Sequence, residues 1–359
     1  MLNGIRIVEF EGLGPGPFAG MTLADLGADV IVIHRKGGGG VVPDGSVLDR
    51  GKRSIALDLK DPDDITTARA LIASADGLIE GLRPGVMERL GLGPDDAHRI
   101  NPALVYGRMT GWGQDGPKSH MAGHDLNYIA TSGALWYAGL PGQPPVTPVT
   151  LVGDIGGGAL YLVVGLLSGI LNAQATGKGT VVDAAIVDGS AHMLNLLMAF
   201  GQAGGLREER GQSLLDGPHW TRSYACSDGG YVSVQCLEPQ FYAEFLRLMS
   251  LADNPVFAQQ HHKSQWADQT AQLAQIFAEH PRDHWAALFE GTDACVAPIY
   301  SPQEAGSDPH VAARAIWHDA PKGQQSAPAP RFDGAHLPVN AAPSRGQHSD
   351  EIRAELVQT

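Results

Sequence analysis

The chain has 359 residues, 43% of them hydrophobic, and its formal net charge at pH 7 is −14. This length can bury one large or two medium cores, and the acidic balance argues against nucleic acid as the main partner. Three cysteines without metal-site spacing, and an N-terminus without the pattern of a signal peptide, lead us to expect a cytoplasmic protein.

Short apolar strands alternate with helical patterns through the first third of the chain. The pattern predicts strands at residues 5–10, 29–34, 54–57, 77–80 and 104–108, and helices at residues 18–26, 64–74 and 84–100. Such alternation is typical of an α/β domain with a Rossmann-like, mostly parallel sheet. The turn at residues 12–17 contains Pro15 and Pro17 and does not match a dinucleotide fingerprint, which argues against NAD.

Basic residues follow several of these strands. Ligands of parallel sheets bind beyond the carboxyl ends of the strands, and arginines there suit phosphate groups. Single lysines there are usually only solvated charges, but arginines recurring after successive strands are equally consistent with a site for an anionic small ligand. The basic residues concerned are Arg35, Lys36, Arg50, Lys52, Arg53, Lys60, Arg83 and Arg89.

Two short segments in the middle of the chain suggest acid/base chemistry. His124 lies in the sequence GHDLNY, and Asp154 in LVGDIGGG, which we interpret as a strand, a glycine-rich turn and then a buried helix. We expect the apolar run at residues 158–171 to be too short to span a bilayer. Both side chains could be simple helix caps, but three consecutive glycines are costly unless something must approach the backbone closely.

The rest of the chain predicts a second, smaller α+β domain. After a strand at 180–185 and a helix at 187–200 we expect a hairpin at 223–226 and 231–236, helices at 240–249, 265–279 and 283–289, and loops beyond residue 300. The expected organisation is a large domain at 1–200 completed by 315–359, a linker at 201–217, a small domain at 218–300 and a return linker at 301–314. Glu238 would, by itself, be only an acid favoured at a helix start.

Several motifs carry a family resemblance that runs from the N-terminus to about Pro298. They are VEFEGLGPGPFAGMTLADLGADVI, RGKRSIALDLK, EGLRPGVMERLGLGP, YGRMTGWGQDGP, GHDLNY, LVGDIGGG, GKGTVVDAAIVDGS, CSDGGYVSV and EPQFY. With these motifs the chain resembles the α-methylacyl-CoA racemases of the family III CoA-transferase (CaiB/BaiF-type) superfamily. One departure is Lys36, followed by four glycines, where the family usually has proline beside the adenine pocket.

The resemblance implies that His124 and Asp154 are two catalytic bases and that Glu238 is hydrogen-bonded to His124. It implies that the first domain binds CoA, which is part of the substrate, so that no separate cofactor or metal is needed. It also implies an interlocked homodimer in which each active site takes Glu238 from the other chain. The substrate and CoA contacts that it implies are Arg35, Leu57, Lys60, Arg83, Arg89, Gly123, Asp125 and Tyr128.

The expected function is inversion of the α-carbon of 2-methylacyl-CoA thioesters by proton transfer through an enolate. The amide of Asp154 and the neighbouring glycine amides would stabilise the enolate oxygen. One alternative is a CoA-transferase that uses Asp154 as a nucleophile, and another is a non-catalytic acyl-CoA-binding protein. The pairing of His124 with Glu238 favours the racemase, because transferases of this superfamily lack that pair.

Overall fold

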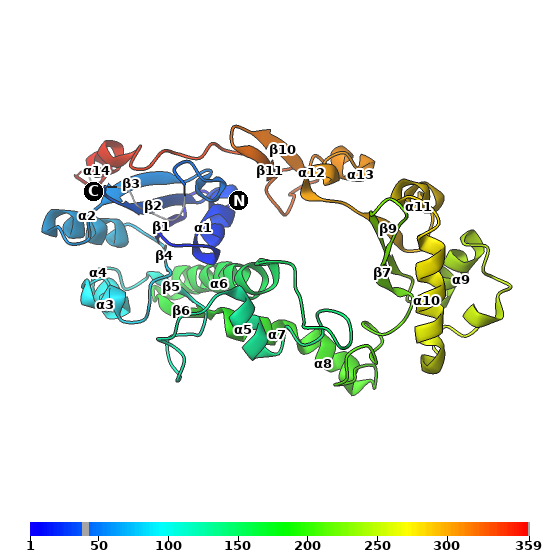
Figure 1. Ribbon diagram of the computed structural model, residues 1–359. Coiled ribbons are helices and arrows are strands. Elements are labelled where there is room, and N and C mark those ends of the chain that lie inside the picture. Colours follow the sequence, from blue (N-terminus) through cyan, green and yellow to red (C-terminus); the bar gives the residue numbers. More distant parts are fainter. Residues whose placement is uncertain (38–42, 358–359) are drawn as a thin grey trace. The chain divides into compact units, whose positions relative to one another are not determined.

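The centre of the fold is a six-stranded parallel sheet. A computed structural model describes residues 1–37 and 43–357, and its strands follow the order β3-β2-β1-β4-β5-β6 (Figure 1). Every neighbouring pair in this sheet is parallel, which confirms the predicted α/β class. The strands are β1 (Arg6–Phe10), β2 (Asp29–Arg35), β3 (Arg53–Leu57), β4 (Gly77–Glu80), β5 (Val105–Thr110) and β6 (Thr180–Ala185).

Helices cover both faces of this sheet. In β1, Ile7 and Val8 point to opposite faces and are both fully buried, each in a separate apolar cluster. Strands buried on both faces are mostly apolar, which is why they are visible in the sequence. The helices α1 (Pro15–Asp25) and α6 (Leu160–Thr176) pack on one cluster, and α2 (Pro62–Ala73), α4 (Pro94–Ile100) and α14 (Ser349–Val357) on the other.

Two predicted helices are broken, and the helices beyond residue 300, α12 (Pro302–Ala305), α13 (Pro309–Ala313) and α14, were missed. Gly91, with φ of 67°, and Pro94 separate α3 (Val86–Arg89) from α4, because neither residue suits a helix interior. The predicted helix at 187–200 is likewise divided into α7 (Ile186–Met193) and α8 (Asn195–Gln202). α14 lies in the tail that we expected to be loop, and its Ile352 is buried against the sheet.

The strand predicted to end at Asp154 is wrong. Leu151–Ala159 instead forms a π-helix, η2, that continues directly into α6. The apolar run at 158–171 is therefore part of a longer helix, Leu151–Thr176, whose 26 residues are by length and composition alone enough to cross a membrane. One side of α6, including Leu162 and Leu166, packs in the sheet's core, as a core helix of a globular domain does.

The glycines of η2 are explained by the close approach of α7. A Cβ at Gly157 would lie 2.3 Å from the Ser190 hydroxyl, and one at Gly189 would lie 1.9 Å from the Gly157 carbonyl oxygen. Neither position has room for a side chain, so the two helices meet backbone to backbone. The close approach that we inferred from the glycines is therefore, in this structure, a contact between helices.

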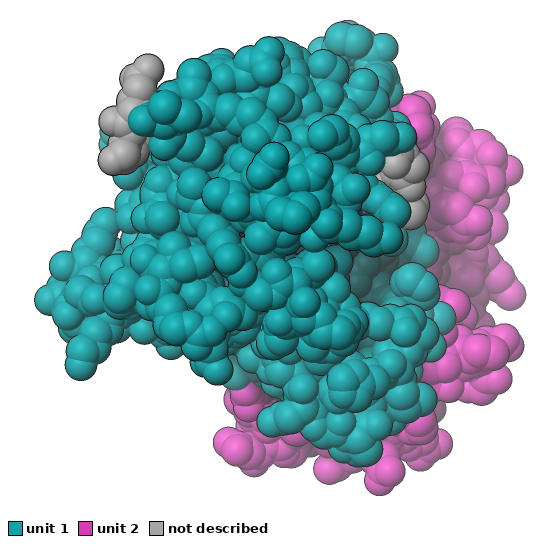
Figure 2. All heavy atoms as spheres, turned by 90° about the vertical axis from the view of Figure 1, so that its left-hand side faces the viewer, with its two compact units in different colours: residues 1–135, 147–194, 318–359 teal, residues 136–146, 195–317 magenta. Residues whose placement is uncertain are grey.

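The chain divides into two compact units, coloured separately in Figure 2. The first is Met1–Leu135, Thr147–Leu194 and His318–Thr359, and the second is Trp136–Val146 and Asn195–Trp317. The second contains the expected hairpin, to which the unpredicted strand β9 adds antiparallel to β8. The remaining elements are α5 (Asp125–Ser132), β7 (Thr221–Ala225), β8 (Tyr231–Gln235), α9 (Pro239–Leu248), α10 (Trp266–Phe277), α11 (Arg282–Phe289), β9 (Val296–Ile299), α12 (Pro302–Ala305), α13 (Pro309–Ala313), β10 (Trp317–Ala320) and β11 (Gly323–Ser326).

Candidate active site

Two neighbouring pockets lie where the strand order of the large sheet reverses. β1 and β4 are adjacent, but the chain leaves them toward opposite edges of the sheet, and ligands of such sheets bind at this point. The loops after the two strands line both pockets. The shared residues are Phe10, Gly12, Leu13, Gly81 and Leu82.

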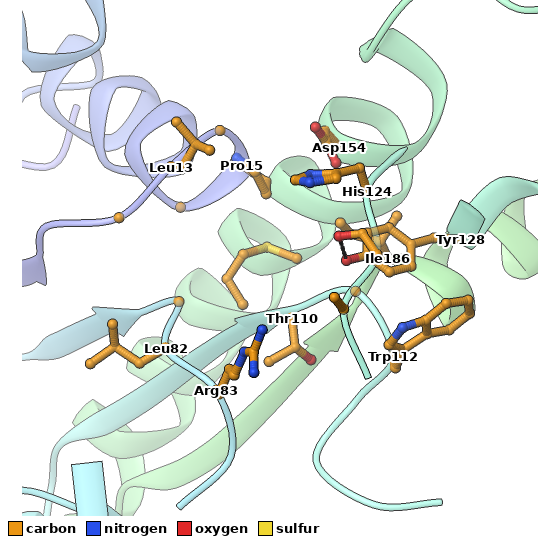
Figure 3. Close-up of a pocket in the computed structure, with 18 of the residues that line it drawn as sticks. Leu13, Pro15, Leu82, Arg83, Thr110, Trp112, His124, Tyr128, Asp154 and Ile186 are labelled. Atoms are coloured by element: carbon orange, nitrogen blue, oxygen red, sulfur yellow. Dashed lines mark hydrogen bonds between the residues drawn. The ribbon is translucent and has the colours of Figure 1, made fainter. Parts of the chain in front are cut away.

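The first pocket, of about 330 Å³, contains His124 and Asp154 and is called here the His–Asp pocket. Figure 3 shows the imidazole of His124 and the carboxylate of Asp154 next to each other at one end of the pocket, close to Pro15. All of its lining residues belong to the first unit. The structure therefore brings together the two side chains that the sequence singled out.

Asp154 lies in the first turn of η2, and Asp125 holds that turn in place. The Asp125 carboxylate is buried, and its Oδ1 accepts hydrogen bonds from the backbone N–H groups of Gly153 (2.8 Å) and Asp154 (2.9 Å). Gly153 has to be glycine, because a Cβ there would lie 2.4 Å from this oxygen. The amides of Asp154 and Gly153, where we expected donors to an enolate oxygen, are thus occupied, and that part of the prediction is wrong.

The environment of Asp154 favours its protonated form. Burial raises the pKa of Asp154 above its usual range, and the nearby charge of Asp125 raises it further. A hydrogen bond from the Thr150 hydroxyl to Oδ2 (3.3 Å) and the proximity of His124 act in the opposite direction without outweighing them. Asp154 is therefore better suited than an ordinary aspartate to carry a proton near neutral pH.

His124 is the N-cap residue of α5 and is exposed. The side-chain oxygen of Asn127 accepts from the backbone N–H of His124 at 3.0 Å, which anchors the start of the helix. One turn further on, Tyr128 packs edge-on against Trp112 and donates from its hydroxyl to the Gly123 carbonyl. These contacts brace the wall of the pocket behind His124, so the GHDLNY motif has a structural role.

The second pocket, of about 700 Å³, is lined by Arg35, Lys36 and Lys60 and is called here the basic pocket. Leu57, at the end of β3, contributes to its wall. Lys36 also approaches Asp64, with 3.6 Å between Nζ and Oδ2. The glycines at 38–40, where the chain departs from the family near the adenine pocket, lie outside the described residues.

The remaining expected cations are placed differently. Arg83 lines the His–Asp pocket, and Figure 3 shows its guanidinium directed into it beside Thr110. Arg89 is not among the described residues that line either pocket. Sequence reasoning missed Glu11 and Asp58, which lie in the basic pocket. The rule that found the basic residues, position just after a strand, would have found these acids too.

Glu238 lies in the second unit, at the N-cap of α9, and is exposed. The His–Asp pocket is lined by the first unit alone, so the expected hydrogen bond between Glu238 and His124 stays a prediction. Cys295 belongs to the same unit. Burial raises the pKa of its thiol, and the negative charge of the nearby Glu238 raises it further.

Comparison with known proteins shows the relationships of the whole chain. The model of CoA-transferase family III matches residues 2–349. Alpha-methylacyl-CoA racemases of Mus musculus and Homo sapiens are 39% and 38% identical to the chain, and each alignment covers 99% of this chain and 93% of the relative. A crystal structure of a CaiB/BaiF family protein from Brucella suis superposes with a TM-score of 0.82 at 29% identity, covering 98% of both chains.

Proposed function

Because the chain belongs to CoA-transferase family III, we propose that it is an isomerase that inverts the α-carbon of 2-methylacyl-CoA thioesters. The observation that carries the proposal is the presence of His124 and Asp154 side by side in one pocket at the switch point of the sheet. The similarity to two alpha-methylacyl-CoA racemases over nearly the whole chain supports the same reaction.

The proposed reaction moves a proton between the two faces of one carbon. A C–H bond next to a thioester carbonyl is weakly acidic, and its loss leaves a planar enolate. Inversion then requires one group that takes the proton and another that returns a proton to the opposite face. Histidine ordinarily titrates near neutral pH and suits the first role, and Asp154, whose pKa is raised by burial and by Asp125, suits the second.

The enolate oxygen needs hydrogen-bond donors that the Asp154 and Gly153 amides cannot supply. The first-turn N–H groups of α5, at Asp125 and Leu126, precede the first hydrogen bond within the helix and therefore have no partner in it. They adjoin His124 at the positive end of the helix, where negative charge is stabilised. We assign these two amides to the enolate oxygen in the proposed reaction.

CoA itself is proposed to extend from the His–Asp pocket into the basic pocket. The loops after β1 and β4 border both pockets and would pass along the pantetheine arm. The cations of the basic pocket would face the nucleotide phosphates. This reaction uses no cofactor beyond the CoA of the substrate.

Incubating the enzyme with one enantiomer of a 2-methylacyl-CoA in D2O tests the proposal. A racemase incorporates α-deuterium and forms the other enantiomer without any acceptor acid. A CoA-transferase with Asp154 as nucleophile would leave the α-carbon unchanged and require an acceptor. A protein that only binds acyl-CoA would show neither reaction, and either of these results would contradict the proposal.

Asp125 provides a separate test of how Asp154 is tuned. Asp125→Asn keeps an oxygen for the two amides but removes the charge that helps to raise the pKa of Asp154. In one direction of inversion, Asp154 gives a proton to the enolate. In that direction kcat/KM falls with rising pH, because Asp154 loses the proton that it has to donate. This limb of the pH profile should move to lower pH in Asp125→Asn.

The other groups near Asp154 are Thr150, His124 and Tyr128, and none of them changes in this variant. Asp125→Ala, which also removes the acceptor of both amides, should lower activity further, by roughly tenfold for a lost charge-assisted cap. An unchanged pH profile in Asp125→Asn would show that Asp125 only holds the helix.

We propose that a second copy of the chain completes each site. On α6, Val164 (62% exposed) and Leu171 (69%) are two turns apart and form an apolar strip. Such a strip is usually covered in a stable assembly. Glu238 would then reach His124 from the partner, as expected from the resemblance.

Mixing two inactive variants tests this shared site. In a heterodimer of Asp154→Asn and Glu238→Ala, one of the two sites would combine an intact first unit with an intact second unit. Random exchange should therefore restore up to about a quarter of wild-type activity. Asp154→Asn mixed with His124→Ala is the matched control, because both changes lie in the first unit and no intact site can form. Equal activity in both mixtures, or a monomer by light scattering, would contradict the shared site.

A further inference from the structure

The basic pocket contains an acid that would oppose an anionic ligand. Glu11 follows β1 and lines this pocket together with Arg35, Lys36 and Lys60. A carboxylate without a partner at this place would repel the phosphates of a nucleotide and cancel part of the attraction of the cations. The structure supplies Glu11 with a partner from the far end of the chain.

Arg345 forms a two-point ion pair with Glu11. Its Nη1 and Nη2 donate to Oε2 and Oε1 at 2.8 and 2.7 Å. The side chains of Glu11 and Arg345 are only 16% and 17% exposed, so solvent screens this pair less than it screens an ordinary surface pair. Partial burial acts to raise the pKa of Glu11, but hydrogen bonds from Arg345 and from the Arg35 backbone outweigh it and hold the pKa below its usual range.

The same contacts fix the backbone of Arg35. The backbone N–H of Arg35 donates to Glu11 Oε2 at 2.8 Å, and Arg345 Nη1 approaches the Arg35 carbonyl oxygen at 3.4 Å. Arg35 ends β2 at the mouth of the basic pocket. The three residues thus form one connected unit, in which Arg345 makes contacts to both of the others.

Arg345 is itself held firmly by its neighbours. Its backbone N–H donates to Asp44 Oδ1 at 2.6 Å, and the N–H of Gly346 donates to the Ser54 hydroxyl at 2.7 Å. Two further hydrogen bonds join His348 to the backbone of Ser54. The guanidinium is therefore pre-positioned, so little side-chain freedom is lost when a ligand binds.

We propose that Arg345 is a positioning residue that sets the affinity for the nucleotide end of CoA by neutralising Glu11 and fixing the Arg35 backbone. Arg345 is not among the described residues that line the basic pocket, so it acts through its two partners. The inference rests on the proposed function only in that the basic pocket takes the nucleotide of CoA.

Calorimetric titration with CoA of the full-length protein and three variants tests this role. Arg345→Gln should weaken CoA binding by about tenfold, and less at high salt, because the uncovered Glu11 charge is then screened. Glu11→Gln keeps an oxygen for the Arg35 N–H and removes the opposing charge, so it should bind CoA more tightly than the wild type does. In the double variant, the loss caused by Arg345→Gln should largely disappear, because no carboxylate remains to be uncovered.

A truncated substrate separates this role from a general structural one. With 2-methylacyl-CoA the KM of Arg345→Gln should rise with little change in kcat. With the corresponding pantetheine thioester, which lacks the nucleotide, KM should stay close to that of the wild type. Glu355→Gln is the matched control. Glu355 belongs to the same C-terminal segment, and its Oε1 lies 2.7 Å from Nη1 of Arg53. The variant therefore loosens this segment at a place away from both pockets.

Several outcomes would overturn the proposal. These are unchanged CoA affinity in Arg345→Gln, no rescue by Glu11→Gln, an equal loss in Glu355→Gln, or an equal rise of KM for the pantetheine thioester. If the wild-type protein inverts its substrate and binds CoA but the variants behave in these ways, only this inference fails. A wild-type protein that does not bind CoA would overturn the proposed function as well.

Discussion

Asp154→Asn is expected to abolish inversion of a 2-methylacyl-CoA, with a loss of roughly 10²- to 10⁴-fold, the usual contribution of one proton-transferring group. Asparagine has nearly the same shape but can neither take nor give the proton. The start of η2 should survive, because the bond to Asp125 comes from the backbone N–H of residue 154 and not from its side chain. The rate of conversion of one enantiomer into the other, followed by chiral chromatography, measures the effect.

CoA binding serves as the control for this variant. The basic pocket does not include residue 154, so the affinity for CoA should stay within about threefold of the wild-type value. Inversion at a rate within about tenfold of the wild type would show that Asp154 is not one of the two bases.

Most of the large sheet could be predicted because its strands are buried on both faces. Such strands are mostly apolar, and glycine, proline and acidic residues mark the turns between them, so the order of strand and helix is visible locally. The family III resemblance then fixed the fold class. β9 and α14 were missed because their burial depends on partners far along the chain and not on a pattern of their own. β9 pairs with β8, and α14 packs on one face of the large sheet.

The error at η2 has a local cause. A short apolar run before a glycine cluster is as typical of a buried strand as of a buried helix. What decides between them is the contact of Gly157 with Gly189, which no local pattern reveals. Asp154 lines the pocket in spite of this error, because a carboxylate in the first turn of a helix and one at the end of a strand both lie at the same edge of the sheet.

The residues that tune the site could not be predicted in the same way. Asp125 follows His124 in the sequence, yet its carboxylate reaches the amides of residues 153 and 154. Arg345 meets Glu11 across a separation of 334 positions. Pairs of this kind depend on tertiary packing, so a single sequence shows the candidate reacting groups more readily than the residues that contact them.

His124→Ala is the second change with a large expected effect, and its sharpest test uses both enantiomers. Each base can reach only the α-proton on its own face of the substrate. Inversion should therefore be lost in both directions in His124→Ala and also in Asp154→Asn, by roughly 10²- to 10⁴-fold. Slow exchange of the α-proton with D2O, without inversion, should remain for one enantiomer in each variant, namely the one that faces the surviving base.

The enantiomer that still exchanges should differ between the two variants. Mass spectrometry of each separated enantiomer after incubation in D2O measures this directly. His124→Gln, which keeps a polar side chain of similar length but cannot act as a base near neutral pH, should behave as His124→Ala does, and this would exclude loss of bulk as the cause. If both variants exchanged the same enantiomer, His124 and Asp154 would act on one face of the carbon. The two side chains would then take part in a different reaction. The first candidate is CoA transfer with Asp154 as the nucleophile.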